Sequence, residues 1–197
     1  MLYKIAHLLR DNCPWLWDLA EAANSLAFAC RYHRGLKRID AVLATVPSGV
    51  HVRRGVEADA DALAAFFARQ PEDAFTYFRP HAFDRQTLQT LLRRTSFIVV
   101  VAEIDGQIVG YSFLRSFVHG RCYMGKMVDA GMQRRGIGKA LCLATMYVAD
   151  ALGLRMFESI NRANIASLKS SSVLRQVIIE ELEDGDMLIE DFLKTTD

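Results

Sequence analysis

Apolar and polar positions along the chain follow two different periods. In residues 1–50 the apolar residues recur at the spacing of one face of a helix. The positions that carry this stripe are Trp15, Leu19, Ala22, Leu26 and Ala29. From residue 51 onward, β-branched runs of strand length alternate with helical patterns. The Pro-Ser-Gly segment at 47–49 separates the two zones, which predicts a helical extension over residues 1–50 and a second unit over residues 51–197.

The pattern over residues 51–197 predicts a sheet with helices between its strands. The expected order is a strand at 51–56, helices that follow Asp59 and Asp84, strands at 97–103, 107–117 and 121–129, a helix at 136–152, a strand at 155–160, a helix at 164–171, and strands at 177–182 and 187–192. Asp59 and Asp84 are expected to cap their helices, and Asp105 with Gly106 predicts a tight hairpin. Because a helix joins the strands at 121–129 and 155–160, at least one strand pair must be parallel. The predicted fold class is therefore α/β, with a mixed, mostly antiparallel sheet flanked by helices.

The helix predicted in residues 1–50 allows three interpretations. It can pack on the main unit, or it can pack on the same helix of a second copy and form a homodimer. Alternatively, it can lie on a membrane surface. Asp18 and Glu21 occupy the face that would meet anionic headgroups, and the basic residues at 31–38 come only after them. Packing against protein is therefore the favoured interpretation.

Composition and charge exclude several classes of protein. Hydrophobic residues make up 51% of the chain and charged residues 24%, which is typical of globular proteins. Lys and Arg number 24 and Asp and Glu 23, so the net charge of +1 provides no basic field for nucleic acid. The apolar runs are too short to span a bilayer, and residues 1–12 lack the core of a signal peptide, which predicts a cytoplasmic protein.

The four cysteines are widely separated and form no Cys-x-x-Cys pair. No histidine lies at ligand spacing from them, so no metal site is expected. In a reducing compartment we expect free thiols. Cys142 falls within a helical pattern and is expected to be a small buried apolar residue.

Residues 133–140 carry the most informative pattern in the chain. They join a strand to a helix and contain two glycines and three basic residues. Glycine lets the backbone approach a ligand closely, and the free N–H groups at a helix start form an anion site. The pattern therefore predicts a site for phosphate or pyrophosphate. A Walker loop is excluded because Gln133 stands where that loop needs a glycine. A dinucleotide-binding fingerprint is excluded because Leu141 stands where that motif needs its third glycine.

The run Gln133-Arg134-Arg135-Gly136-Ile137-Gly138 resembles the acyl-CoA loop of the GNAT superfamily of N-acetyltransferases, whose pattern is Gln/Arg-x-x-Gly-x-Gly/Ala. Downstream, the run from Asn161 to Leu168 resembles the second motif of that family, in which an asparagine contacts the pantetheine arm. The order of elements over residues 51–197, roughly three quarters of the chain, is similar to the fold of that family.

The resemblance implies acetyl-CoA as the acyl donor and assigns roles to individual residues. Backbone N–H groups would bind the pyrophosphate from Gln133, Arg135, Gly136, Ile137, Gly138, Lys139 and Ala140. Arg134, Arg135 or Lys139 would reach further phosphate. The backbone of Met127 and Val128 would pair with the pantetheine like an added strand, and Asn164 would hydrogen-bond to it. The acceptor would enter from the opposite side, where the fourth and fifth strands of the domain separate.

Acetyl transfer to an amine requires a proton acceptor, because a primary amine with a pKa near ~10.4 attacks only after losing a proton. The strand at 121–128 holds no carboxylate, so Glu158 in the next strand is a candidate base, and a solvent-facing or salt-bridged Glu158 is the alternative. Tyr123 is a candidate acid or water-holding group, or else a half-buried strand tyrosine. The chain departs from the family at Ser171, where a tyrosine acid is usual, and at Ala130, where proline is common.

Tyr77, Arg79 and His81 lie in the segment that borders the acceptor pocket in similar proteins. Together they would suit an acidic or sugar-phosphate acceptor, and a loop anchored by buried aromatic rings is the alternative. The first hypothesis is acetyl transfer to the primary amine of a small molecule, such as an amino sugar or a polysaccharide precursor. The second is an acyl-CoA-binding module without catalysis, used in regulation or assembly. A third hypothesis places the main function in residues 1–50, docked on a membrane or a partner.

Overall fold

The computed structural model describes residues 14–182 and 185–194. Its centre is a seven-stranded sheet in the order β1-β2-β3-β4-β5-β7-β6. The strands are β1 His51–Arg54, β2 Phe97–Ile104, β3 Gln107–Ser116, β4 Arg121–Val128, β5 Arg155–Asn161, β6 Arg175–Glu181 and β7 Asp186–Phe192. β4 and β5 pair in parallel, and the other neighbours pair antiparallel. The predicted mixed, mostly antiparallel sheet is confirmed.

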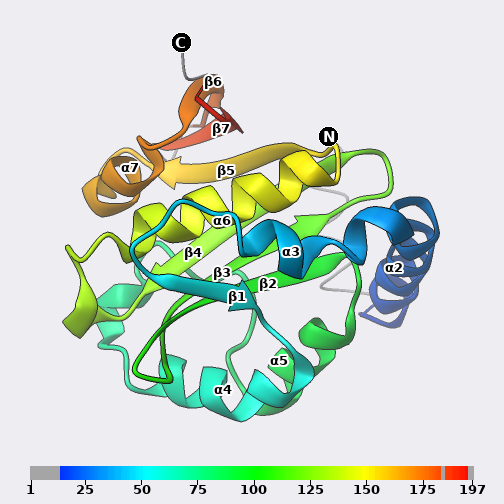
Figure 1. Ribbon diagram of the computed structural model, residues 1–197, viewed down its shortest axis with the longest axis horizontal. Helices are drawn as coiled ribbons and strands as arrows, with labels where there is room; N and C mark the ends of the chain where they lie inside the picture. Colours follow the sequence, from blue (N-terminus) through cyan, green and yellow to red (C-terminus); the bar gives the residue numbers. More distant parts are fainter. Residues whose placement is uncertain (1–13, 183–184, 195–197) are drawn as a thin grey trace.

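Helices cover both faces of this sheet (Figure 1). They are α2 Pro14–Leu36, α3 Ile39–Leu43, α4 Ala60–Ala68, α5 Arg85–Arg93, α6 Ile137–Ala151 and α7 Ile165–Ser171, with 3₁₀ turns at Glu57–Asp59, Glu72–Phe75 and Ala130–Met132. The side chains of α3 and α6 share one core with Val100 of β2, and those of α4 and α5 share a second core with Val99. Because both of its faces are covered, the apolar run at 97–102 is buried throughout.

Short-range signals set several element boundaries as predicted. β2 and β3 form a hairpin that turns at Asp105 and Gly106, whose φ angles of 51° and 74° match the left-handed turn that this pair favours. At α5, the carboxylate of Asp84 accepts a 2.9 Å hydrogen bond from the N–H of Thr87. α6 ends before Gly153, which has a φ of 66°.

Asp59 occupies the N-cap position of α4, as predicted, but its side chain accepts no hydrogen bond from that helix. Its carboxylate accepts a 2.8 Å bond from the N–H of Val56, which precedes it in the chain, and two 2.8 Å bonds from the guanidinium of Arg53. Arginine on the neighbouring strand offers a planar pair of charged donors, which bind a carboxylate more strongly than a single amide of the helix start does.

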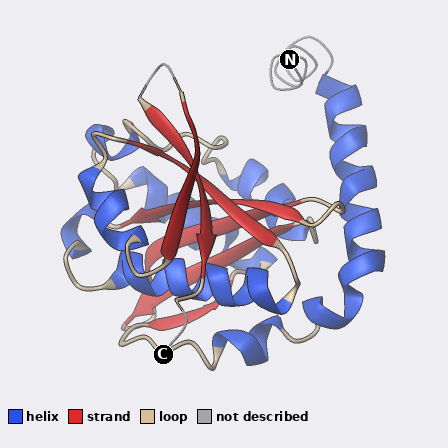
Figure 2. Ribbon diagram, turned by 90° about the horizontal axis from the view of Figure 1, so that it is seen from above, coloured by secondary structure: helices blue, strands red, loops and turns tan. Residues whose placement is uncertain are grey.

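α2 lies beside the sheet (Figure 2), and the face that it turns to the domain combines polar residues with the buried Phe28. Leu19 and Leu26 of the apolar stripe are 59% and 70% exposed. On the opposite side, the amide of Asn24 donates to the carbonyl of Ser116 at 2.9 Å, while its oxygen accepts from the N–H of Val118 at 3.1 Å. The amphipathic helix therefore turns its apolar stripe away from the sheet, contrary to the usual expectation for such a stripe.

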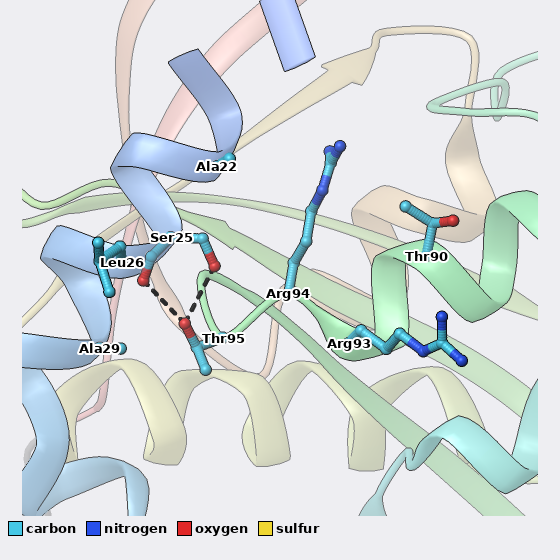
Figure 3. Close-up of a pocket in the computed structure, with 8 residues that line it drawn as sticks. All are labelled: Ala22, Ser25, Leu26, Ala29, Thr90, Arg93, Arg94 and Thr95. Carbon is cyan, nitrogen blue, oxygen red and sulfur yellow. Dashed lines mark hydrogen bonds between the residues drawn. The ribbon is translucent and has the colours of Figure 1, made fainter. Parts of the chain in front are cut away.

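Further contacts fix α2 in this orientation. Ser25 and Thr95 exchange hydrogen bonds across the junction of α2 and α5, at the edge of an open cavity (Figure 3). The carboxylate of Glu21 pairs with Arg115 on β3. Phe28 is fully buried and joins the core around α6, as do Ile39 and Leu43 of α3. Residues of the predicted extension thus contribute to the core of the main unit.

Within the described ranges, no helix combines the length and the apolar character that crossing a bilayer demands. Cys30 is exposed, whereas Cys122 and Cys142 are buried, and all three are free thiols. The prediction of a buried Cys142 is confirmed, and Cys13 lies outside the described residues.

Candidate active site

β4 and β5 pair over only part of their length. The register runs from Arg121 opposite Arg155 to Met124 opposite Glu158 and stops there. β4 continues to Val128, where its other edge still pairs with Gly110 of β3. The edge of β4 that faces β5 is therefore open from residue 125 to residue 128. Met127 and Val128, the residues expected to pair with pantetheine, belong to this open edge.

The loop after β4 presents backbone amides and cations to solvent. Arg134 and Gly136 have φ angles of 62° and 80°, so the chain turns through two left-handed residues before α6 begins at Ile137. The N–H groups in the first turn of an α-helix have no carbonyl partner within the helix, and the helix dipole makes that end positive. Arg134, Arg135 and Lys139 are exposed there. Across the described part of the chain, no carboxylate forms an ion pair with any of the three.

Close packing holds this helix start in place. A Cβ on Gly138 would lie 2.9 Å from Cβ of Ser170, so glycine lets α6 approach α7. A Cβ on Gly110 would lie 2.8 Å from the side chain of Ile137, so glycine also lets α6 approach β3. The predicted apolar stripe of α6 is buried at Ile137, Leu141, Ala144, Val148 and Leu152. The amides of the loop are consequently fixed relative to the open edge of β4.

A buried ion pair spans the point where β4 and β5 part. Nζ of Lys126 lies 3.2 Å from Oε2 of Glu158, and the two side chains are 6% and 3% exposed. The ammonium group also donates to the hydroxyl groups of Ser171 at 2.7 Å and Ser167 at 3.2 Å, both on α7. Ser171, at the position where a tyrosine is usual in the family pattern, thus binds the ammonium group of Lys126. The sequence did not indicate Lys126 as a site residue, because a single lysine in a strand is usually a surface residue.

The ion pair is part of a larger polar network, which Gln176 of β6 and Asp191 of β7 complete. Nε2 of Gln176 donates to Glu158 at 3.1 Å and to Oδ1 of Asp191 at 3.0 Å. Burial and the nearby charge of Glu158 raise the pKa of Asp191 to about 8. Burial by itself would lower the pKa of Lys126, but Cys142 and Glu158 outweigh it and hold that pKa above its ordinary value. Lys126 is therefore an ammonium ion at neutral pH, and the network favours a protonated Asp191.

A cavity of about 350 Å³ opens beside this fork in the sheet. It lies between the segment at 76–79 and the ends of β5 and β7. The residues that line it are Thr76, Tyr77, Phe78, Arg79, Ser159, Asn161, Asn164 and Asp186. Tyr77, Arg79 and Asn164 were predicted as site residues, and the structure brings them together around one cavity.

Two polar residues of the cavity wall, Ser159 and Asp186, escaped the sequence reasoning. Asp186 accepts hydrogen bonds from Nδ2 of Asn161 at 2.8 Å and from the hydroxyl of Ser159 at 3.2 Å. This places a carboxylate in the wall that also carries Arg79. The only signal available was that Asp186 follows a predicted turn, which is also the usual setting of a solvated aspartate.

Asn164 has a structural task besides lining the cavity. Its Oδ1 accepts a 3.1 Å hydrogen bond from the N–H of Ser167 and caps α7. The cap occupies the oxygen, so a ligand in the cavity would meet the Nδ2 donor of this side chain.

His81 lies in the aromatic core instead of the cavity. Its Nε2 is 2.9 Å from the hydroxyl oxygen of Tyr111, and its Nδ1 is 2.8 Å from the carbonyl oxygen of Ala82. The rings of Phe67 and Phe83 pack against it. Burial lowers the pKa of His81, so the ring is neutral at pH 7. The alternative prediction, a loop anchored by buried aromatic rings, describes this residue.

Tyr123 lies on the paired part of β4, three residues before Lys126. Its ring packs 5.8 Å from that of Phe157, and the residue is 38% exposed. Its side chain does not line the cavity. The geometry is that of a half-buried strand tyrosine.

The model of the Acetyltransferase (GNAT) family matches residues 62–169 of this chain. The chain belongs to this family. It is therefore an acetyltransferase that uses acetyl-CoA as its acyl donor. The resemblance that the loop at 133–138 carries is thereby confirmed, and the loop lies within the matched residues.

Solved structures share the fold at low sequence identity. The ribosomal-protein-S5-alanine acetyltransferase of Vibrio fischeri is 18% identical, with a TM-score of 0.62 over 74% of this chain and 93% of its own. The GNAT domain of PAT from S. lividans is 19% identical, with a TM-score of 0.61 over 73% and 90%. AAC(6′)-Ib, solved in complex with paromomycin and acetyl-CoA, is 15% identical, with a TM-score of 0.55 over 75% and 94%. No curated protein matches the sequence.

The arrangement fits acetyl-CoA on three grounds. A Cβ on Gly136 would meet no atom within 4 Å, so the space in front of the loop is open. The exposed Arg134, Arg135 and Lys139 can neutralise phosphate, and the open edge of β4 can pair with the amide groups of pantetheine.

Among the described residues, no group of three His, Cys, Asp or Glu side chains is placed to hold a metal ion.

Proposed function

We propose that the protein transfers the acetyl group of acetyl-CoA to the primary amine of a small molecule. The observation that carries this proposal is the meeting of two features at one fork in the sheet. The open edge of β4 and the loop at 133–140 form a donor site, and the cavity beside the fork offers an acceptor site. A volume of about 350 Å³ suits a small ligand.

On the donor side, backbone amides supply most of the binding. The N–H groups of Gln133 and of residues 135–140 would hold the pyrophosphate, with Arg134, Arg135 and Lys139 around it. Met127 and Val128 would pair with the pantetheine, and Nδ2 of Asn164 would donate to it. When bound, acetyl-CoA supplies a thioester whose carbonyl carbon is open to attack by an amine.

On the acceptor side, the cavity wall combines opposite charges. Asp186 attracts the ammonium form of an amine, and Arg79 attracts a phosphate or carboxylate elsewhere on the same molecule. Tyr77 is 50% exposed and offers a ring surface of the kind on which sugars stack. These groups favour an amino sugar, or a precursor that carries one, as the acceptor.

The reaction requires three things of the chain. The amine must lose a proton before its nitrogen attacks, the carbonyl oxygen needs an N–H donor as it gains charge, and the thiolate needs a proton after the C–S bond breaks. We assign the backbone N–H of Val128 as the donor to the thioester carbonyl oxygen. Glu158 is the one carboxylate of β4 and β5, so it remains our candidate for the base, and Tyr123 for the acid, although both have packing roles.

A second candidate function is an acyl-CoA-binding module without catalysis. The observation that favours it lies at Ser171, which is fully buried and hydrogen-bonded to Lys126. A serine in that setting supplies no phenol to protonate the departing thiolate. A module would bind acetyl-CoA and leave every amine unmodified.

The test measures thiol release from acetyl-CoA over a panel of primary amines, with acetyl-CoA binding followed by calorimetry. We expect turnover with at least one amino sugar. Gly136→Asp adds a negative charge and backbone strain at the anion site, and it should weaken acetyl-CoA binding roughly tenfold or more. Gly153→Asp is the matched control: its φ of 66° and its open surroundings resemble those of Gly136, but it lies at the other end of α6.

The outcomes separate the candidates. Binding without turnover on any amine supports the module. A folded protein that gives no heat on titration with acetyl-CoA overturns both candidates, and so does equal weakening by the two aspartate variants.

Three predictions from the sequence stay predictions: the cytoplasmic location, the domain boundary near residue 50 and a homodimer through the N-terminal helices. The exposed Leu19 and Leu26 of α2 are compatible with the third. The same residues are compatible with peripheral membrane contact, and liposome flotation of the full chain beside Leu26→Lys would reveal it.

A further inference from the structure

A short 3₁₀ turn, Ala130–Met132, connects β4 to the loop at 133–140, and its backbone N–H groups are all occupied. The N–H of Gly131 donates to Oδ1 of Asp129 at 2.9 Å, and the N–H of Met132 donates to the carbonyl oxygen of Asp129, also at 2.9 Å. Among the residues that the structure describes, the N–H groups from Gln133 to Gly136 have no such partner. Contacts within the protein therefore fix the turn, whereas the loop after it keeps its N–H groups free for a ligand.

The side chain of Gln70, just beyond the end of α4, holds the third N–H group of the turn. Its Oε1 accepts a 2.9 Å hydrogen bond from the N–H of Ala130. Its Nε2 donates to Oδ2 of Asp129 at 3.2 Å and to the carbonyl oxygen of Phe66 at 2.8 Å. Gln70 is 8% exposed, and its amide has partners for its oxygen and its nitrogen, so the side chain is held in one orientation.

Arg69 anchors the same carboxylate from the neighbouring position. Its Nε donates to Oδ2 of Asp129 at 2.8 Å, and its guanidinium also donates to the carbonyl oxygen of Ile108 on β3. Burial raises the pKa of Asp129, but the hydrogen bonds from Arg69 and Gln70 outweigh burial and lower that pKa below its ordinary value. Asp129 is therefore a carboxylate at neutral pH. Arg69, Gln70 and Asp129 together are called the turn clamp below.

The clamp meets the turn at the position where the family commonly has proline. Proline has no N–H and fixes φ near −65°, within the range of a 3₁₀ turn. The backbone of Asp129, with φ of −49° and ψ of 128°, is extended, as a residue before proline prefers. The backbone at Ala130 could thus accept proline. In this chain a hydrogen bond to Gln70 restrains the turn, where a proline ring would do so in the family pattern.

We propose that Gln70, supported by Arg69 and Asp129, is a positioning residue for acetyl-CoA binding. By holding the turn at 130–132, the clamp keeps the loop at 133–140 in the shape that receives pyrophosphate. A preformed loop loses less conformational entropy when its ligand binds, so the clamp raises the affinity. The inference rests on the proposed binding of acetyl-CoA at this loop, and it concerns the donor site alone.

Calorimetric titration with acetyl-CoA tests the proposal on four proteins: the wild type, Gln70→Ala, Ala130→Pro and the double variant. Gln70→Ala leaves the N–H of Ala130 unpaired and should raise the dissociation constant about tenfold. Ala130→Pro should also weaken binding, because its ring would meet Oε1 of Gln70, which lies 2.9 Å from the backbone nitrogen. In the double variant the ring fills the space that Gln70 vacates and restrains the turn. The double variant should therefore bind within about threefold of the wild type.

Two further variants separate the clamp from a general loss of stability. Gln89→Ala is the matched control, because the amide of Gln89 donates to Glu57 at 2.9 Å on another part of the surface. It should bind acetyl-CoA as the wild type does. Asp129→Asn keeps an oxygen for the N–H of Gly131 but turns an amide group toward Arg69, so it should weaken binding in the same direction as Gln70→Ala.

Hydrogen exchange of the unliganded proteins provides a readout that does not depend on binding. The amides of residues 131–136 should exchange faster in Gln70→Ala than in the wild type, and the double variant should restore their protection. Heat from the wild type with an unchanged dissociation constant in Gln70→Ala overturns the inference and leaves the proposed function in place. So does a double variant that binds as weakly as Gln70→Ala. A folded wild type that gives no heat overturns the proposed function and the inference together.

Discussion

At the scale of single residues, the polar groups beneath the fork depend on one another. Lys126 has three hydrogen-bond donors, and Glu158, Ser167 and Ser171 accept from it. A buried charge is tolerated only when it is paired and fully hydrogen-bonded, and this lysine meets both conditions. The fork in the sheet therefore holds a buried, hydrogen-bonded ion pair beside the open edge of β4.

Asp191 makes the stability of the fold depend on pH. Its pKa is about 8 in the folded chain, against an ordinary value of 3.8, so the folded state retains a proton that the unfolded state releases. The resulting stability is fully present below the unfolded pKa and is lost as pH rises through about 8. Between about pH 6 and about pH 9, the wild type should lose on the order of 2 kcal/mol more than Asp191→Asn does.

Urea unfolding at the two pH values measures that difference. Asp61→Asn is the control, because Asp61 is exposed and should leave the pH dependence unchanged. Parallel pH profiles for the wild type and Asp191→Asn would contradict the assignment.

At the scale of elements, α2 shows that an apolar stripe does not by itself identify the packed face. The edge of the domain that receives α2 presents Arg94, Thr95 and Arg115, which pair with acidic and hydroxyl groups. Polar contacts with these groups and burial of Phe28 orient the helix, so Leu19 and Leu26 of the apolar stripe stay exposed.

Two neighbouring positions of α2 test this orientation. Phe28→Ala should cost about 3–5 kcal/mol of unfolding free energy, because Phe28 is fully buried. Leu26→Ala should change it by less than about 0.5 kcal/mol, because Leu26 is exposed. Chemical denaturation of both variants provides the comparison, and equal losses would show that the stripe also packs.

At the scale of the whole molecule, the extension and the acetyltransferase unit share one core. Phe28, Ile39 and Leu43 are at most 3% exposed and pack around α6. A chain that begins at Ser48 lacks all three side chains. It should unfold at least about 3 kcal/mol more easily than the full chain, as judged by urea titration.

A chain that begins at Pro14 is the control for this truncation, because it keeps every buried residue of the described part. Equal stability of the chain from Ser48 and the full chain would show instead that residues 51–197 form an independent domain.

Features that depend on a few neighbouring residues could be predicted from the sequence. The hairpin at Asp105 and Gly106, the cap at Asp84 and the loop at 133–138 each depend on backbone conformations that only certain residues favour. The parallel pair of β4 and β5 followed from the helix between them, because a parallel connection needs such a crossover. These signals suffice for the fold class, the family and the donor loop.

Contacts between distant segments were decided only by the tertiary structure. Asp186 and Arg79 line one cavity because a hairpin and a loop meet beside the fork, and Lys126 is buried because α7 brings two hydroxyl groups to it. His81 lies in the aromatic core and not in the predicted acceptor site, because the hydroxyl group of Tyr111 provides a hydrogen-bond partner there. A local pattern specifies which contacts a residue can make, and the surface that the fold places opposite it decides which of them it does make.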